Sequence, residues 1–219
     1  MFGKPGGDEN AVRVKICGIT NERDARWAID CGANALGFNF FSGSKRFLDV
    51  RSAEQWLRRL PSEMLKVAVL VDPSWSEATR VADYEFIDCL QLHGNESPEF
   101  CQRLAERGVR FTKALPVSDR DSLLRAPQFF TNTILLDRST ERGFGGTGET
   151  FPWEIAAQFV KSRPELKVIL AGGLTPENVA EAIMKVRPFG VDVTTGTELS
   201  PGQKDQGRLQ AFIAAARSA

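Results

Sequence analysis

A cysteine and an aspartate each close a short apolar stretch of this chain, and together they could transfer protons. Cys17 ends the alternating stretch 12–17 (VRVKIC), on the face opposite the β-branched residues. A thiol there could act as a general base if its neighbours favour the thiolate. Asp137 ends the stretch 133–137 (TILLD), where a carboxyl group beside apolar side chains could donate a proton. An acid and a base on opposite sides of a substrate suit an isomerase, although Asp137 could equally cap a helix or pair with Arg138.

Most cysteines are small buried apolar residues, and that interpretation applies to three of the four here. Cys31 and Cys101 fall in predicted helices, and Cys89 falls inside a predicted strand. Cys17 differs because it closes a strand and faces away from the apolar side. Its position alone therefore distinguishes Cys17 from the other three cysteines as a candidate catalytic residue.

Two glycine- or threonine-rich turns near the end of the chain predict a phosphate site. Gly172 and Gly173 follow one predicted strand, and Thr194 and Thr195 follow the next. In eight-stranded α/β barrels the loops after strands seven and eight often bind phosphate, with a short extra helix. Main-chain N–H groups and the helix dipole supply the attraction, so no lysine cluster is needed.

Other loop and strand-end residues could complete a ligand site. Gly146 lies in the glycine-rich segment 143–148, which could be a substrate-covering lid or a surface loop. Arg46 could hold a carboxylate in a two-pronged contact, although loop arginines are usually solvated. His93 is the one histidine and could line the substrate or be structural, and Asp192 could do either as well.

Eight short, near-continuous apolar segments, each followed by a helix pattern, must position these residues. Such strands are typical of a parallel sheet covered on both faces. Eight units at this length predict a single-domain α/β fold, a closed (β/α)8 TIM barrel over residues 11–219, with residues 1–10 as a flexible, disordered tail. An open doubly wound sheet is the alternative, but the expected early glycine fingerprint is missing. The predicted strands are 12–18, 34–41, 66–71, 86–93, 109–115, 133–137, 166–171 and 190–193.

Local start signals mark several of the helices between these strands. A serine followed three residues later by Gln or Glu is a capping box, and a cap followed by proline fixes the first turn. A short helix is also expected over 118–125. The signals are Ser52 with Gln55, Ser74 with Glu77, Ser97 with Pro98, and Thr175 with Pro176.

The bulk composition limits the class of partner. The 28 Lys and Arg residues balance 28 Asp and Glu residues, which argues against nucleic acid or a membrane surface as the main partner. One histidine and no CxxC pair make a metal site unexpected. Four cysteines without an apparent signal peptide favour reduced thiols in the cytoplasm.

The motifs together resemble one family, phosphoribosylanthranilate isomerase of tryptophan biosynthesis. They span nearly the whole chain, and their combination is far more specific than any single piece. The matching stretches are VKICGIT (14–20), LGFNFFSGSKR (36–46), LQLHGNE (90–96), ILLD (134–137), GFGGTGETFPW (143–153), AGGLTPENV (171–179) and GVDVTTGTELSPGQKD (190–205).

The resemblance implies a role for each candidate. Cys17 would be the general base and Asp137 the general acid of an Amadori rearrangement of N-(5-phosphoribosyl)anthranilate. Arg46 would bind the anthranilate carboxylate, and His93 and Asp192 would line the substrate. Substrate binding is also assigned to Gly146, and phosphate binding to the main chain around Gly172, Gly173, Thr194 and Thr195.

The resemblance further implies that no metal or organic cofactor is required, because the substrate's own iminium ion accepts the electrons. The partner would be a small phosphoribosyl molecule, and the chain would act as a monomer or homodimer. One departure concerns Arg138, whose charge beside Asp137 would favour the ionised acid unless it points to solvent.

Two other functions stay open at this point. A related phosphosugar isomerase, such as the ProFAR isomerase of histidine synthesis, would usually carry an aspartate where Cys17 stands. A non-catalytic phosphate-binding barrel would not need both Cys17 and Asp137. Assays with the anthranilate substrate and with ProFAR distinguish the two isomerases. Binding without turnover would favour the non-catalytic barrel.

Overall fold

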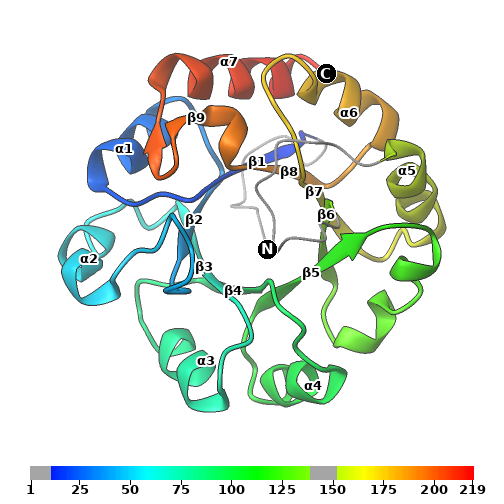
Figure 1. Cartoon of the computed structure of the whole chain (residues 1–219), viewed down its shortest axis with the longest axis horizontal. Helices are drawn as coiled ribbons and strands as arrows, with labels where there is room; N and C mark the ends of the chain where they lie inside the picture. The colour runs from blue at the N-terminus through cyan, green and yellow to red at the C-terminus, as the bar shows by residue number, and fades with distance from the viewer. Residues whose placement is uncertain (1–10, 139–151) are drawn as a thin grey trace.

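Eight parallel strands close into a barrel in the computed structural model, which describes residues 11–138 and 152–219. Each strand pairs with the next along the chain, and β8 returns to pair with β1 (Figure 1). The predicted closed barrel is therefore confirmed. The predicted tail 1–10 and Gly146 lie outside the described residues. The strands are β1 (Arg13–Cys17), β2 (Ala35–Asn39), β3 (Leu65–Leu70), β4 (Cys89–Leu92), β5 (Phe111–Val117), β6 (Thr133–Arg138), β7 (Lys167–Leu170) and β8 (Gly190–Val193).

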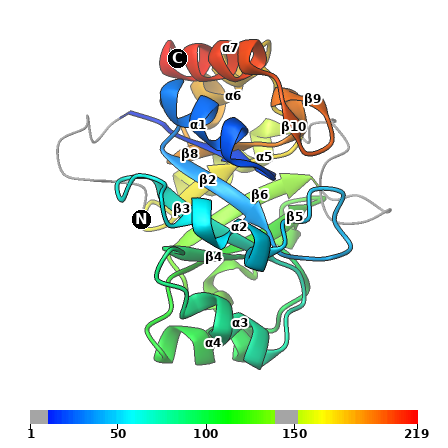
Figure 2. The ribbon, with the colours of Figure 1, turned by 90° about the vertical axis from the view of Figure 1, so that its left-hand side faces the viewer.

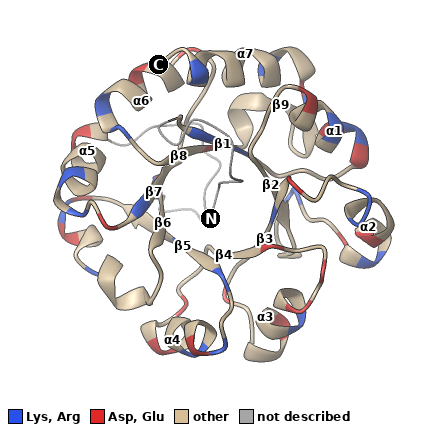
Figure 3. Cartoon of the chain, turned by 180° about the vertical axis from the view of Figure 1, so that it is seen from behind, with Lys and Arg blue, Asp and Glu red and all other residues tan. Residues whose placement is uncertain are grey.

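Helices form the outer ring around this barrel (Figure 1, Figure 2). Their charged residues of both signs are interspersed around the ring, as Figure 3 shows, and this accords with the zero net charge. No helix among the described residues is both long and apolar enough to cross a bilayer. The helices are α1 (Glu22–Asp30), α2 (Val50–Leu57), α3 (Trp75–Ala82), α4 (Pro98–Glu106), α5 (Trp153–Ser162), α6 (Val179–Val186) and α7 (Gln206–Arg217).

The two faces of the strands build two separate cores. Val14 and Ile16 of β1 belong to the large core between the barrel and its helices. The opposite face of the strands fills the barrel interior with a smaller cluster of apolar side chains, among them Val67, Cys89 and Ile169. Lys15 and Cys17 share this inward face by the period-two alternation of a strand. The alternation noted in the sequence thus directs Cys17 towards the barrel axis.

Helix starts agree with the sequence in two cases. Ser74 and Glu77 form the predicted capping box at α3. Ser97 caps α4, with Pro98 in its first turn. Both serines stabilise the start of their helix, because the side-chain oxygen accepts a hydrogen bond from a backbone N–H that has no partner within the first turn.

The other predicted starts were wrong. Asp49 caps α2, and Ser52 instead donates its hydroxyl to the Asp49 carbonyl. A hydrogen-bonded turn rather than a helix follows Thr175, whose carbonyl accepts from the N–H groups of Asn178 and Val179 and whose own N–H donates to the Asn178 side chain. The helix α6 begins only at Val179. The expected helix over 118–125 is replaced by two short 3-10 helices, η1 (Asp121–Leu123) and η2 (Ala126–Phe129).

The connection after β8 contains three short elements that the sequence did not predict. They are η3 (Thr195–Thr197), β9 (Glu198–Ser200) and β10 (Gln203–Lys204), and the last two pair as an antiparallel hairpin. The hairpin lies near the start of α7 (Figure 2). It brings residues 198–204 close to the barrel mouth, where they meet the loop after β2.

Candidate active site

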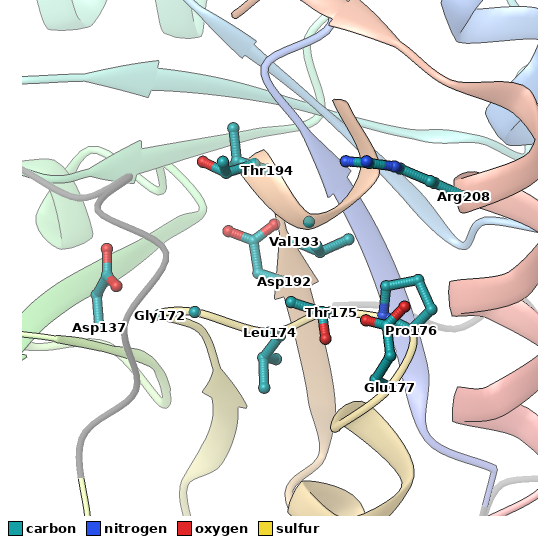
Figure 4. Close-up of a pocket in the computed structure, with 13 residues that line it drawn as sticks. Asp137, Gly172, Leu174, Thr175, Pro176, Glu177, Asp192, Val193, Thr194 and Arg208 are labelled. Atoms are coloured by element: carbon teal, nitrogen blue, oxygen red, sulfur yellow. The ribbon is translucent and has the colours of Figure 1, made fainter. Parts of the chain in front are cut away.

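The predicted site residues within the described part of the chain lie at one end of the barrel, because parallel strands end on the same side. Cys17 ends β1, Asp137 lies one residue before the end of β6, and His93 directly follows β4. Asp192 lies in β8, and Arg46 lies in the loop after β2. A cavity of about 350 Å³ opens at this end, and Asp137, Gly172, Gly173, Asp192, Thr194 and Thr195 line it (Figure 4).

Asp137 is buried and held at both carboxylate oxygens. Its Oδ1 accepts the N–H of Arg138 at 2.8 Å, and its Oδ2 lies 3.2 Å from Nε2 of His93. His93 Nδ1 lies 2.9 Å from the Gln91 side-chain nitrogen. With the amide donating to Nδ1, the imidazole presents its Nε2–H to Asp137. The two contacts fix the direction in which the carboxyl group faces the cavity.

Gln91 was missed at the level of sequence, although a signal was present. Gln91 and His93 are two residues apart on β4 and its extension, so they share a face. A buried amide on the inward face of an apolar strand needs a hydrogen-bond partner, and His93 supplies it.

Cys17 lies beside a buried ion pair within the barrel. Lys15 Nζ donates to Asp192 Oδ1 at 2.9 Å, and both side chains are almost fully buried. Burial alone lowers the pKa of Lys15, but the Asp192 carboxylate and then Cys17 outweigh it and raise that pKa above its ordinary value. Asp192 thus serves as a structural acceptor and also lines the cavity. Lys15 was missed, although it shares the face of Cys17 in the sequence.

Gly37 provides the space for Cys17. In the register of β1 and β2, Gly37 lies opposite Cys17. A Cβ at position 37 would lie 2.7 Å from Cys17 Sγ and 2.9 Å from Lys15 Nζ, closer than real Cβ contacts. The glycine therefore lets the sulfur and the ammonium group occupy the inward face together.

Arg46 lies across the end of β1 and pairs with Glu198. Its Nε donates to Glu198 Oε1 at 2.8 Å, and its Nη2 donates to Glu198 Oε2 at 2.6 Å. Nη2 also donates to Thr195 Oγ1 at 3.2 Å. A side chain at Gly18, whose φ is +76°, would collide with the Arg46 stem. Glu198 was missed because its partner is 152 residues away in the chain.

The two predicted phosphate turns meet on one wall of the cavity. Gly172 and Gly173 have φ of +82° and +65°, a backbone conformation that favours glycine. A side chain at Gly172 would crowd Asp137 Oδ1, so its absence lets this turn approach the carboxyl group. Figure 4 shows Gly172 between Asp137 and Asp192.

Several N–H groups of this wall are available to an anion. Those of Gly172, Gly173, Thr195 and Gly196 donate to no residue that the structure describes. The first turn of η3 adds the partial positive charge of a helix start. Arg208 also lines the cavity and was not predicted; its Nη1 donates to the Glu198 carbonyl at 2.8 Å. Within residues 11–138 and 152–219, no cluster of His, Cys, Asp or Glu could hold a metal ion.

A family model described as "N-(5'phosphoribosyl)anthranilate (PRA) isomerase" matches residues 14–215. The chain belongs to the phosphoribosylanthranilate isomerase family. The resemblance in the sequence motifs is therefore confirmed. The isomerase of Geobacter sp. strain M21 is 42% identical over 206 residues, which cover 94% of this chain and 98% of the relative.

Solved structures of the family share the fold. The phosphoribosylanthranilate isomerase of Thermotoga maritima has a TM-score of 0.86 at 39% identity, covering 95% of this chain and 100% of that one. A second structure holds reduced 1-(o-carboxyphenylamino)-1-deoxyribulose 5-phosphate and has a TM-score of 0.82 at 38% identity, with the same coverage. That bound molecule carries a carboxylate at one end and a phosphate at the other, so a site for it must recognise both.

Proposed function

We propose that this chain converts N-(5-phosphoribosyl)anthranilate to 1-(2-carboxyphenylamino)-1-deoxyribulose 5-phosphate, an isomerisation in tryptophan biosynthesis. The observation that carries the proposal is one cavity with Asp137 on one side and, on another, the N–H groups of Gly172, Gly173 and Gly196, which donate to no described residue. A sugar phosphate spans such a cavity when its phosphate rests on the amides and its ring faces the carboxyl group.

Asp137 acts as the general acid in this proposal. It donates a proton to the ribose ring oxygen, the bond between C1′ and that oxygen breaks, and the nitrogen lone pair forms a protonated Schiff base. The contacts of Asp137 with His93 and with the Arg138 N–H support this role because they hold the carboxyl group in one orientation.

Cys17 acts as the general base. The positive charge of the Schiff base acidifies the C2′ proton, and Cys17 takes that proton as a thiolate. The resulting enolamine then loses its enol proton while C1′ gains one, which yields the ketose product. The cation Lys15, nearly fully buried beside the sulfur, supports the role because it favours negative charge there. The substrate supplies its own electron sink, so the mechanism needs no cofactor.

The remaining predicted residues bind the substrate. Arg46 takes the anthranilate carboxylate, and the phosphate rests on the main chain of Gly172, Gly173, Thr194 and Thr195. Asp192 and His93 contact the sugar. Gly146, outside the described residues, is assigned to the same substrate by its motif.

The partner is this phosphoribosyl molecule and not a nucleic acid or membrane, and the chain acts as a monomer or homodimer. We place the enzyme in the cytoplasm, where thiols stay reduced. None of the four cysteines, all within the described residues, forms a disulfide bond, which supports that placement.

Single substitutions at the two reacting groups test the proposal. Cys17→Ala and Asp137→Asn should each lower kcat by several orders of magnitude while circular dichroism stays unchanged. Cys31→Ala is the matched control, because this thiol lies at the end of α1 away from the barrel mouth and should leave turnover intact. Near-normal turnover in either active-site variant would refute the proposed acid–base mechanism. Turnover of ProFAR instead of the anthranilate substrate would favour the other isomerase.

A further inference from the structure

A buried carboxylate at the barrel mouth has no part in the proposed proton transfers. The Glu198 side chain is only 2% exposed, at the start of β9. Its Oε1 accepts from the Gly202 N–H at 3.2 Å and from Lys204 Nζ at 3.3 Å. Both oxygens also accept from Arg46. A carboxylate taken this far out of water needs such partners, and here three residues supply them.

The pairing determines which donors of Arg46 are available to a ligand. A guanidinium group offers one edge formed by Nε and Nη2 and a second edge formed by Nη1 and Nη2. Glu198 occupies the first edge, with contacts of 2.8 and 2.6 Å. Nη1 donates to no residue that the structure describes. The donors left for a ligand carboxylate are therefore the two Nη1 N–H groups and the one Nη2 N–H that now contacts Thr195.

The same pairing joins the two ends of the expected substrate site. Arg46 comes from the loop after β2, whereas Glu198 directly follows η3, whose amides face the cavity. Thr195 contributes an N–H to the phosphate wall and a hydroxyl to Arg46. The distance between the carboxylate-binding arginine and the phosphate-binding turn is therefore set by direct contacts and not by the long chain between them.

We propose that Glu198 is a positioning residue that aims the Nη1 side of Arg46 at the substrate carboxylate and thereby sets the preference for a carboxylated aromatic amine. The proposal rests on the proposed function, in which Arg46 binds that carboxylate. Charge neutralisation alone would not need a forked contact, whereas aiming a planar group does. Glu198 thus acts through Arg46 and touches no reacting atom.

Binding of two analogues separates this role from a purely structural one. The probes are reduced 1-(o-carboxyphenylamino)-1-deoxyribulose 5-phosphate and the same molecule without its carboxylate. Glu198→Gln should weaken binding of the first by about 10- to 100-fold, the range seen when a residue that orients a metal ligand is replaced, and leave binding of the second unchanged. The double variant Arg46→Ala with Glu198→Gln should bind no more weakly than Arg46→Ala alone, because the two residues act as one unit.

Each other outcome has a definite meaning. Equal weakening of both probes by Glu198→Gln, or no weakening of either, overturns the positioning role. Additive losses in the double variant overturn it as well. If Arg46→Ala weakens both probes equally, the carboxylate role of Arg46 in the proposed function fails instead. Should Glu198→Gln not fold, Glu198→Asp keeps the charge but retracts it by one methylene, and the same selective loss for the carboxylated probe is expected.

Discussion

Adding one methyl group at Gly37 should displace the candidate base without touching the phosphate wall. The new Cβ would lie 2.7 Å from Cys17 Sγ, 2.9 Å from Lys15 Nζ and 3.1 Å from Cys17 Cα. Favourable contacts lie at about 3.5–4.0 Å, so the sulfur must retreat by about 1 Å. The backbone at Gly37 is ordinary strand, so crowding and not backbone strain is the perturbation.

The expected losses follow from that displacement. Overpacking a well-filled interior destabilises a protein by about 1–3 kcal/mol. At this chain length each kcal/mol shifts Tm by roughly 2–4 °C. A misplacement of about 1 Å in a reacting group lowers the rate by about 100-fold, which corresponds to about 2.7 kcal/mol in the barrier. Gly37→Ala should therefore fold, melt earlier and lose most of its kcat.

Three measurements test this prediction. Steady-state turnover gives kcat, thermal unfolding gives Tm, and titration with the reduced product analogue shows whether phosphate binding persists. Gly108→Ala is the control, because a Cβ there meets nothing within 4 Å. The φ of +77° at Gly108 imposes about 1–2 kcal/mol of backbone strain on an alanine. Gly108→Ala should therefore lower Tm by about as much as Gly37→Ala while kcat stays normal. A folded Gly37→Ala enzyme with unchanged kcat would refute the reasoning.

Three further changes give distinct outcomes. Gly196→Ala places a methyl group against the Leu174 carbonyl, so it should raise KM and weaken inorganic phosphate binding; unchanged phosphate affinity would contradict the proposed wall. Lys15→Met leaves Asp192 buried without its partner and should lower the free energy of unfolding by about 3–5 kcal/mol, measured in urea, with recovery when Asp192→Leu is added. A loss below about 1 kcal/mol would show that the pair is unimportant. Burial raises the pKa of Cys89 to about 12. Its thiol stays protonated in the folded protein, whereas in the unfolded chain the same thiol ionises above about pH 9, so the free energy of unfolding should fall between pH 9 and 12. The fall should be less steep in Cys89→Ala, and an identical slope in the two proteins would refute this.

The order of strands could be predicted from the sequence, but the contacts at the mouth could not. Short apolar segments separated by helix signals are local patterns, and they located each of the eight strands to within a few residues. Strand ends then placed Cys17 and Asp137 on one side because parallel strands share a direction. The same logic located the turns at Gly172 and Thr194.

Pairings between residues far apart in the sequence have no such local signature. Lys15 and Asp192 are 177 residues apart, and Arg46 and Glu198 are 152 residues apart. Neither member of either pair reveals its partner by spacing. Arg46 was expected to bind a ligand carboxylate through two donors of its guanidinium group. In the structure the Glu198 carboxylate already occupies the edge formed by Nε and Nη2. The helix starts failed at Ser52 for a local reason, since Asp49 caps first and ties up the serine hydroxyl.

The closure of β1 onto β8 carries a consequence for how the enzyme is made. A ribosome releases β1 first, yet that strand cannot complete its pairing until residues 190–193 emerge. The edge of β1 that pairs with β8, at Val14 and Ile16, therefore lacks its partner strand while most of the chain is synthesised. Lys15, the cation beside the thiol, therefore gains its Asp192 partner only in the last step of assembly. Chains that stop before β8 should be inactive even when the seven earlier strands are complete.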